Sequence, residues 1–269
     1  MSSETPKPVP RATYRLQFTK DFGFAQAADL ASYLAELGIS HVYASPYLRA
    51  RPGSTHGYDI VSHTELNPEL GTPESFDRMA TAFRENELGQ ILDFVPNHMG
   101  VGGADNPWWL DVLEWGPESE YAGWFDIDWE SDRRYLQNKL LVPFLGDQYG
   151  AVLEAGGLVL KFEPETGSFA VWAYDSHKLP ICPAHYARIL GVADPDLERL
   201  GDAFGHLAAW RPHITRRARE LKQELAGLAQ RDPEVAAAAQ QAVERASMVR
   251  SATWSAGAIS RPTPTASWR

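Results

Sequence analysis

The first part of the chain alternates between short apolar runs and stretches in which apolar residues recur at helical spacing. Residues 12–18 and 41–45 are rich in Thr, Tyr, Val and Phe, which favour strands. Residues 90–95 form a third apolar run, which predicts a strand buried on both faces. Residues 27–37 and 72–86 have helical periodicity, the second with a Thr-Pro signal at its start. This alternation predicts consecutive βαβ units and a parallel sheet.

The middle of the chain breaks this alternation. Residues 99–182 are rich in Gly, Pro and Trp, and they contain two strand patterns, at 158–163 and 168–174, joined by a turn at 164–167. Apolar side chains on one face of the first strand can oppose Phe169 on the second. We therefore expect a small β-containing subdomain, with an antiparallel hairpin, inserted after the third parallel strand.

The two ends of the chain have a different character. Residues 1–11 are polar and Pro-rich, and they lack the apolar core of a signal peptide. Residues 183–245 have helical periodicity, whereas residues 246–269 contain no Asp or Glu and lose periodicity at Arg261-Pro262-Thr263-Pro264. The predicted organisation is a polar leader (1–11), the βα units (12–98), the inserted subdomain (99–182), a helical segment (183–245) and a disordered or aberrant tail (246–269).

Composition excludes several classes of function. The chain has 25 Lys and Arg against 35 Asp and Glu, and an acidic chain without a basic stripe is a poor partner for nucleic acid or an anionic membrane. The single cysteine, Cys182, excludes an internal disulfide framework. No window approaches 18 consecutive apolar residues, so we expect a cytoplasmic protein that does not cross a membrane. The 11% aromatic content fits either core packing or flat platforms for sugar rings.

Polar residues that could bind a ligand follow the second and third predicted strands. Asp93 is a charge inside an apolar strand, which is costly unless it is paired, and His98 follows at the strand's end. His56, Tyr58 and Asp59 share the loop after the second strand, where Asp59 could orient His56 or accept a ligand hydroxyl. Sites in parallel α/β folds lie at the carboxyl ends of strands. The alternative is structural, with Asp93 tying down a loop and His98 bonded within it.

Several familiar catalytic motifs are absent from the sequence. It contains no HExxH or CxxC metal motif, no glycine-rich phosphate loop and no GxSxG elbow. We therefore expect neither a metal nor a cofactor. What remains is a set of Asp, His, Asn, Tyr and Trp residues of the kind that binds carbohydrate.

The run DFVPNH, residues 93–98, resembles the first sequence signature of the α-amylase superfamily, glycoside hydrolase family 13. HGYD, residues 56–59, resembles the tyrosine loop of that superfamily. Together with ATYRLQF (12–18) and GISHVYASPYLRARPGSTHGYDI (38–60), these runs make residues 10–245 similar to the maltooligosyl trehalose synthase family. Members of that family isomerise the reducing-end α-1,4 linkage of a maltooligosaccharide to an α,α-1,1 linkage, in trehalose biosynthesis.

The resemblance implies a substrate and a set of binding residues. The substrate would be a maltooligosaccharide or another α-1,4-glucan. Tyr58 matches the tyrosine that stacks on the sugar, His98 matches the histidine that hydrogen-bonds a sugar hydroxyl, and Asp93 matches the strand aspartate beside the same sugar. His56 and Asp59 complete the expected substrate-binding set.

The catalytic carboxylates of the family have no match in this sequence. Family members are retaining enzymes with a nucleophile and an acid/base roughly 5 Å apart, and no GxRxDH-like segment follows a fourth strand here. A (β/α)8 barrel takes about 250 residues, and only three convincing parallel strands occur. We therefore expect an incomplete (β/α)8 TIM-type barrel of about three βα units, in a truncated N-terminal segment that is an enzyme by family and inactive alone.

Two other interpretations stay open on the sequence alone. The chain could be a non-catalytic α-glucan-binding module that keeps the aromatic rim without the chemistry. It could also be one half of a split α-amylase-family enzyme, with the missing strands supplied by a downstream fragment as its partner.

Overall fold

The computed structural model of the protein describes residues 9–191, 194–207 and 214–256. The chain divides into two compact units, Met1–Val101 (unit 1) and Gly102–Arg269 (unit 2). Each unit has a hydrophobic core of its own. No helix within the described residues is long and apolar enough to cross a bilayer.

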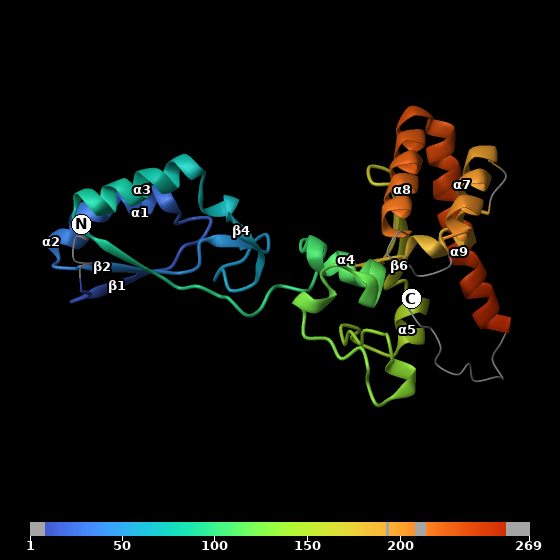
Figure 1. The fold of residues 1–269 in the computed structure, drawn as a ribbon, viewed down its shortest axis with the longest axis horizontal. Coiled ribbons are helices and arrows are strands. Elements are labelled where there is room, and N and C mark those ends of the chain that lie inside the picture. The colour runs from blue at the N-terminus through green and yellow to red at the C-terminus, as the bar shows by residue number, and fades with distance from the viewer. Residues whose placement is uncertain (1–8, 192–193, 208–213, 257–269) are drawn as a thin grey trace, which may run out of the picture. The chain divides into compact units, whose positions relative to one another are not determined.

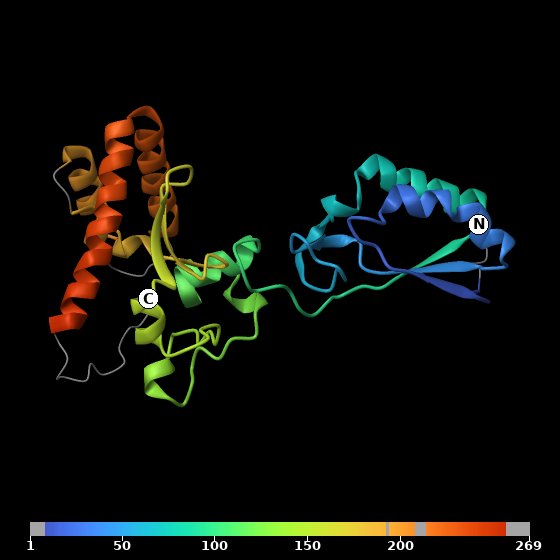
Figure 2. The same ribbon diagram turned by 180° about the vertical axis from the view of Figure 1, so that it is seen from behind.

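Unit 1 is built on a parallel sheet of three strands, in the order β1-β2-β5. Helices α1 and α3 lie side by side over one face of this sheet (Figures 1 and 2). The predicted strands and their parallel pairing are confirmed, whereas the helix expected at 27–37 begins earlier and divides at Leu30. The elements are β1 (Thr13–Leu16), α1 (Phe24–Asp29), α2 (Ala31–Glu36), β2 (His41–Ala44), α3 (Pro73–Glu85) and β5 (Gly89–Leu92).

Alternation along the strands explains why one face of the sheet is buried. Leu16, Val42 and Ala44 are each 5% exposed or less, and they pack in one cluster with apolar side chains of α1 and α3. Arg15 and Tyr43, which are paired in register, have the opposite orientation along their strands. The sheet therefore has a buried apolar face and a second face that carries polar and aromatic side chains.

The prediction that the third strand is buried on both faces is wrong. Leu92 is 44% exposed, and Phe94, just beyond the strand, is 52% exposed. β5 ends the strand order of the described sheet and pairs with β2 alone. Its apolar side chains therefore have a neighbouring strand on one side only.

A two-stranded antiparallel sheet follows β2 in the chain. It pairs β3 (Leu48–Ala50), which lies within the loop expected up to Asp59, with β4 (Ile60–Leu66), for which the sequence predicted no element. Gly57, in the connection between these strands, has φ +76°, and an added Cβ would lie 3.3 Å from the Pro46 carbonyl oxygen. Glycine is therefore favoured in the turn that presents Tyr58.

Unit 2 contains the predicted hairpin and the helical segment. The hairpin has the expected pairing, with Phe162 opposite Phe169, and a third strand that the sequence did not predict extends it. Strands β6 (Leu158–Glu163), β7 (Ser168–Ala173) and β8 (His177–Pro180) form an antiparallel sheet. The helices are α4 (Pro107–Trp115), α5 (Tyr149–Glu154), α6 (Ala187–Leu190), α7 (Pro195–Gly205), α8 (Ile214–Arg231) and α9 (Pro233–Ala256), with short 3-10 turns at η2 (Gly116–Glu118), η3 (Ala122–Trp124) and η4 (Arg134–Leu136).

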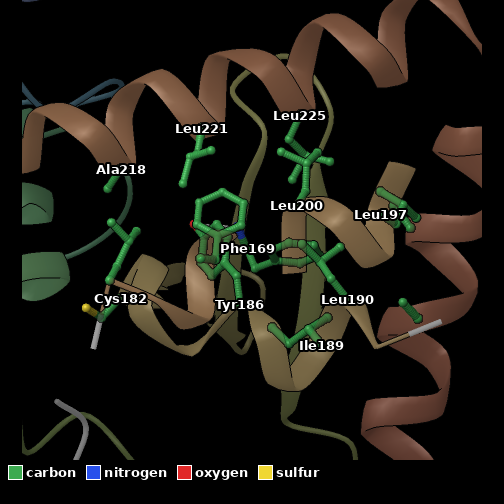
Figure 3. Close-up of a cluster of buried hydrophobic side chains, with 14 of the residues drawn as sticks. Phe169, Cys182, Tyr186, Ile189, Leu190, Leu197, Leu200, Ala218, Leu221 and Leu225 are labelled. Carbon is green, nitrogen blue, oxygen red and sulfur yellow. Dashed lines mark hydrogen bonds between the residues drawn. The ribbon is translucent and has the colours of Figure 1, made fainter. Parts of the chain in front are cut away.

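One core joins the hairpin to the helices of unit 2. Phe169 on β7 and Tyr186 before α6 are both fully buried, and Leu221 on α8 packs in the same cluster (Figure 3). The Tyr186 hydroxyl accepts a hydrogen bond from the backbone N–H of Phe169 at 3.1 Å, so the buried phenol has a partner. Residues on both sides of position 182 contribute to this core. The predicted boundary at that position stays a prediction.

The predicted tail and leader lie largely beyond the described residues. α9 continues through Ala256, ten residues past position 246, where we expected the tail to begin. Residues 257–269 and 1–8 lie outside the described residues.

Candidate functional site

Asp93 lies at the carboxyl end of the parallel sheet, directly after β5, and three side chains donate to one of its oxygens. The Arg15 Nη1 atom is 2.8 Å from Asp93 Oδ2, the Tyr58 hydroxyl oxygen is 2.5 Å from it, and the Tyr43 hydroxyl oxygen is 3.3 Å from it. Arg15 Nη2 also donates to the Tyr58 hydroxyl at 3.0 Å. The four side chains form one hydrogen-bonded group, which we call the Asp93 cluster.

The sequence places each member of the cluster by a local rule. Arg15 and Tyr43 are neighbours on β1 and β2, and the Arg15 guanidinium lies 4.4 Å from the centroid of the Tyr43 ring, as in a cation–π contact. Asp93 continues β5 through a hydrogen bond from its N–H to the Ala44 carbonyl at 3.0 Å. Tyr58 enters from the loop before β4. Two parallel strands and one loop therefore supply donors to a carboxylate at the end of the third strand.

These contacts change the acidity of the cluster. Hydrogen bonds from Tyr58 and Arg15 lower the pKa of the Asp93 carboxyl, while the same hydrogen bond to Asp93 raises the pKa of the Tyr58 hydroxyl. Asp93 is therefore an ionised acceptor at neutral pH and is poorly suited to act as a general acid. Within the described residues, its Oδ1 atom accepts no hydrogen bond from the protein, so this oxygen can accept one from a ligand.

His98 belongs to the same place in the fold. Its Nε2 atom lies 3.0 Å from the Tyr58 carbonyl oxygen, which requires the proton on Nε2 and leaves Nδ1 as an acceptor in the neutral ring. The carbonyl bond fixes His98 beside Tyr58 across 40 residues of sequence. The expected structural role and the expected binding role use different nitrogens of the same ring.

His56 and Asp59 lie in the Tyr58 loop without joining the Asp93 cluster. His56 Nδ1 accepts the Tyr58 backbone N–H at 3.1 Å, and the two rings stack with centroids 5.9 Å apart. Asp59 Oδ1 accepts the Ser54 hydroxyl at 2.5 Å and lies 3.8 Å from His56 Nδ1. At that distance Asp59 makes no hydrogen bond to His56, so its contact with Ser54 organises the loop instead.

Two members of the cluster were not among the predicted site residues. Arg15 shares one face of β1 with Thr13, and Gln17 continues this spacing just beyond the strand, so the sequence did contain a polar face here. Tyr43 occupies the corresponding position on β2. The isolated charge of Asp93 predicted a cationic or hydrogen-bonding partner, but it did not show which Lys or Arg of the chain would be that partner.

Within the described residues, no group of three or more His, Cys, Asp or Glu side chains could hold a metal ion. The Asp93 cluster itself contains one carboxylate, and that carboxylate is bound by a guanidinium. The cluster therefore provides hydrogen-bond acceptors and a partly exposed aromatic ring, since Tyr58 is 37% exposed.

Comparison with known proteins gives the relationships of the chain. Residues 28–155 match the family model of the alpha amylase catalytic domain. A protein of Mycobacterium tuberculosis (strain ATCC 25618 / H37Rv), assigned as a maltooligosyl trehalose synthase, is 42% identical over 170 residues, which cover 58% of this chain and 22% of that protein. This chain is a relative of the maltooligosyl trehalose synthases.

A solved synthase structure and an amylase are also similar to this chain. The structure of maltooligosyltrehalose synthase from Arthrobacter ramosus is similar with a TM-score of 0.57 and 35% identity, over 70% of this chain and 23% of that one. The intracellular maltogenic amylase of Bacillus subtilis (strain 168) is 33% identical over 99 residues, which are 37% of this chain and 16% of that enzyme. The chain thus spans about a fifth of the length of both synthases, and the resemblance found in the sequence is confirmed.

Proposed function

We propose that this chain is an N-terminal segment of a (1→4)-α-D-glucan 1-α-D-glucosylmutase, a maltooligosyl trehalose synthase, and that it contributes part of the substrate-binding site. In this proposal β1, β2 and β5 are the first strands of a (β/α)8 barrel. The observation that carries the proposal is the Asp93 cluster at the carboxyl ends of these strands, where barrel enzymes bind substrate.

The cluster suits one glucose ring of an α-1,4-glucan. The exposed face of Tyr58 can pack against the C–H face of a pyranose, because the aromatic face is electron-rich and the C–H groups are its electropositive complement. Asp93 Oδ1 and His98 Nδ1 can each accept a hydrogen bond from a sugar hydroxyl. Arg15 and Tyr43 hold Asp93 so that this oxygen keeps one position, and His56 supports the Tyr58 ring from within its loop.

The chain alone is expected to be catalytically inactive. A retaining transfer needs a nucleophile and an acid/base about 5 Å apart, and the Asp93 cluster offers one carboxylate, which hydrogen bonds from Tyr58 and Arg15 keep ionised. Loss of such a pair costs several orders of magnitude in rate. The expected partner is a downstream fragment that supplies the carboxylates and the remaining strands. Those strands would pair with the outer edges of β1 and β5.

Two measurements on the full chain test the proposal. Titration with maltopentaose by calorimetry should show saturable binding that is about tenfold weaker in Tyr58→Ala and unchanged in Tyr33→Ala. Tyr33 is a matched control because it is 57% exposed on α2, in the same unit. Cellopentaose, with β-1,4 linkages, serves as the ligand control.

The second measurement is the disappearance of reducing ends from maltopentaose. We expect none from the chain alone, and recovery when it is co-expressed with the downstream part of a related synthase. Conversion by the chain alone at enzyme-like rates would contradict the expectation that this chain lacks the catalytic carboxylates. Saturable binding with no recovery by the added fragment would favour the α-glucan-binding module instead.

A further inference from the structure

Two polar side chains, one on β1 and one just beyond it, reach the loop that carries Tyr58. Arg15 Nη2 donates a hydrogen bond to the Tyr58 hydroxyl at 3.0 Å, across 43 residues of sequence. Gln17 follows two residues later and shares the same face of the strand direction. Its Nε2 atom lies 3.5 Å from the Thr55 carbonyl oxygen and 3.4 Å from the His56 carbonyl oxygen. The first strand of the sheet thus contacts both the ring and the backbone of this loop.

The other hydrogen bonds of Tyr58 order its backbone rather than the far end of its ring. The Tyr58 N–H donates to His56 Nδ1 at 3.1 Å, and the Tyr58 carbonyl oxygen lies 3.0 Å from His98 Nε2. The His56 ring stacks beside the phenol ring, with centroids 5.9 Å apart. Within the described residues, the hydrogen bonds at the far end of the ring are those of the hydroxyl with Arg15 and Asp93. The direction of this partly exposed ring therefore depends on these two groups.

Arg15 has the shape to hold two groups at once. Its Nη1 atom is 2.8 Å from Asp93 Oδ2, and its Nη2 atom is 3.0 Å from the Tyr58 hydroxyl oxygen. Since that hydroxyl also donates to Asp93 Oδ2, each of the three side chains is hydrogen-bonded to the other two. A guanidinium is planar and presents its donors in a fixed fork. The Tyr43 ring, whose centroid lies 4.4 Å from the guanidinium carbon, supports the plane of that fork.

A ring that is held in place before a ligand arrives binds that ligand more tightly. A tyrosine ring turns about two side-chain torsions, and a ligand that packs on its face must stop this motion. The cost of immobilising one such side chain on binding corresponds to roughly a 2- to 12-fold loss of affinity. A ring that the protein already holds avoids this loss. The same contacts engage the Tyr58 hydroxyl, so the ring offers its face to a ligand.

We propose that Arg15 is a positioning residue of the carbohydrate site, which acts through Tyr58 and does not bind the sugar itself. Its Nη2 atom fixes the Tyr58 ring relative to the Asp93 carboxylate, so that the stacking face and the accepting Oδ1 atom keep one separation. The positioning rests on the contacts described above, whereas the identity of the ligand as an α-1,4-glucan rests on the proposed function.

The first test is the mobility of the Tyr58 ring in the absence of sugar. Order parameters from carbon-13 relaxation of the ring C–H groups report this motion, and the Tyr58 resonances are those missing in Tyr58→Phe. Arg15→Met, which removes both donors and keeps an apolar stem, should lower the order parameter. Arg49→Met should leave it unchanged. Arg49 on β3 is a matched control, because its pair with Glu65 at 2.8 Å is also an arginine–carboxylate pair in unit 1.

The second test is a double-mutant cycle in which calorimetry measures maltopentaose affinity at pH 7, where a carboxyl of ordinary pKa is ionised. Arg15→Met should weaken binding about fivefold in the chain and less than about twofold in Tyr58→Phe, because a Phe ring has no hydroxyl for Arg15 to hold. A role in folding alone would give equal losses in both backgrounds. Arg15→Lys should lie between the chain and Arg15→Met, because it keeps a charge beside Asp93 but loses the planar fork.

Two results would overturn the inference. The first is a Tyr58 order parameter that neither Arg15→Met nor Arg15→Lys lowers. The second is a loss of affinity in Arg15→Met that is equal in the chain and in Tyr58→Phe. If Arg15→Met fails to fold, as judged by circular dichroism, Arg15→Lys provides both measurements. If the unchanged chain does not bind maltopentaose, the proposed function fails, whereas the order parameter still decides whether Arg15 holds the Tyr58 ring.

Discussion

The ion pair between Glu114 on α4 and Lys222 on α8 provides a test of what holds unit 2 together. Its Oε1 and Nζ atoms are 2.6 Å apart, and the side chains are 12% and 17% exposed. The pair joins residues 108 positions apart in the chain. Lys222→Met keeps most of the aliphatic stem in place and removes the ammonium, so the variant isolates the charge.

The magnitude follows from the burial of the two groups. Removing one partner of a buried ion pair costs about 3–5 kcal/mol, because the remaining charge has lost its compensation. Some water reaches both groups here, so we expect the lower end, about 3 kcal/mol. Simultaneous Glu114→Gln should recover part of this loss, since no uncompensated charge then remains.

The cost should also depend on pH, with a definite sign. Burial raises the pKa of the Glu114 carboxyl, and Lys222 opposes this rise. Without Lys222, the pKa in the folded state rises further above the unfolded value of about 4.3. The folded state then binds the proton more tightly, so the destabilisation is greatest at pH 8 and decreases as the pH falls through the folded pKa.

Urea unfolding followed by tryptophan fluorescence measures this cost for unit 2, where all the tryptophans lie. The matched control is Arg217→Met on the same helix, whose pair with Glu220 is exposed by about half on both sides and should contribute at most about 1 kcal/mol. The argument fails if Lys222→Met costs no more than Arg217→Met, or if its cost is the same at pH 5 and pH 8.

Three further outcomes are expected. Because Tyr58 and Arg15 lower the pKa of Asp93, the contribution of its carboxylate to maltopentaose binding, measured in calorimetry as the affinity of the chain divided by that of Asp93→Asn, should stay constant from pH 8 to 5 and be lost only below about pH 4; a ratio that has already fallen to one at pH 5 would contradict the assignment. Gly167→Ala should lower the free energy of unfolding in urea by at least about 2 kcal/mol, since Gly167 has φ +60° and the new Cβ would lie 2.0 Å from the Lys222 carbonyl oxygen; an unchanged free energy of unfolding would refute this. Burial raises the pKa of the Cys182 thiol to about 11, so at pH 8 it should react with Ellman's reagent about 100-fold more slowly in the folded chain than in urea, and equal rates would contradict its burial.

The parallel sheet could be predicted from the sequence because burial imposes a period on its strands. Val42 and Ala44 alternate with Tyr43, and the helix that begins after Thr72 has a capping hydroxyl that accepts the Ser75 N–H. The β3–β4 pair was missed because its connection, residues 51–59, is longer than a tight hairpin turn and carries no two-residue turn signal. β8 was missed because its four residues include Lys178 and Pro180, which are typical of an edge strand.

The site was predicted in part for a related reason. Tyr58 and His98 lie in the connections that follow β2 and β5, so chain order alone places them at one edge of the sheet. Arg15 lies 78 residues before Asp93, and spacing cannot select it from the other cations of the chain. The register of β1 on β2 on β5 is what brings these two side chains together, and register is decided by the whole buried face rather than by any local motif.

The Asp93 cluster is better explained by positioning than by stability. The Arg15 and Asp93 side chains are 33% and 18% exposed, so their ion pair is partly solvated and contributes little to folding. Their arrangement is nevertheless strict, because three donors from three elements meet on the same carboxylate oxygen. A purely structural ion pair has no need to direct every donor to Oδ2. Within the described residues this leaves Oδ1 without a hydrogen bond from the protein, next to the partly exposed Tyr58 ring, so under the proposed function Oδ1 is the oxygen that would accept a sugar hydroxyl.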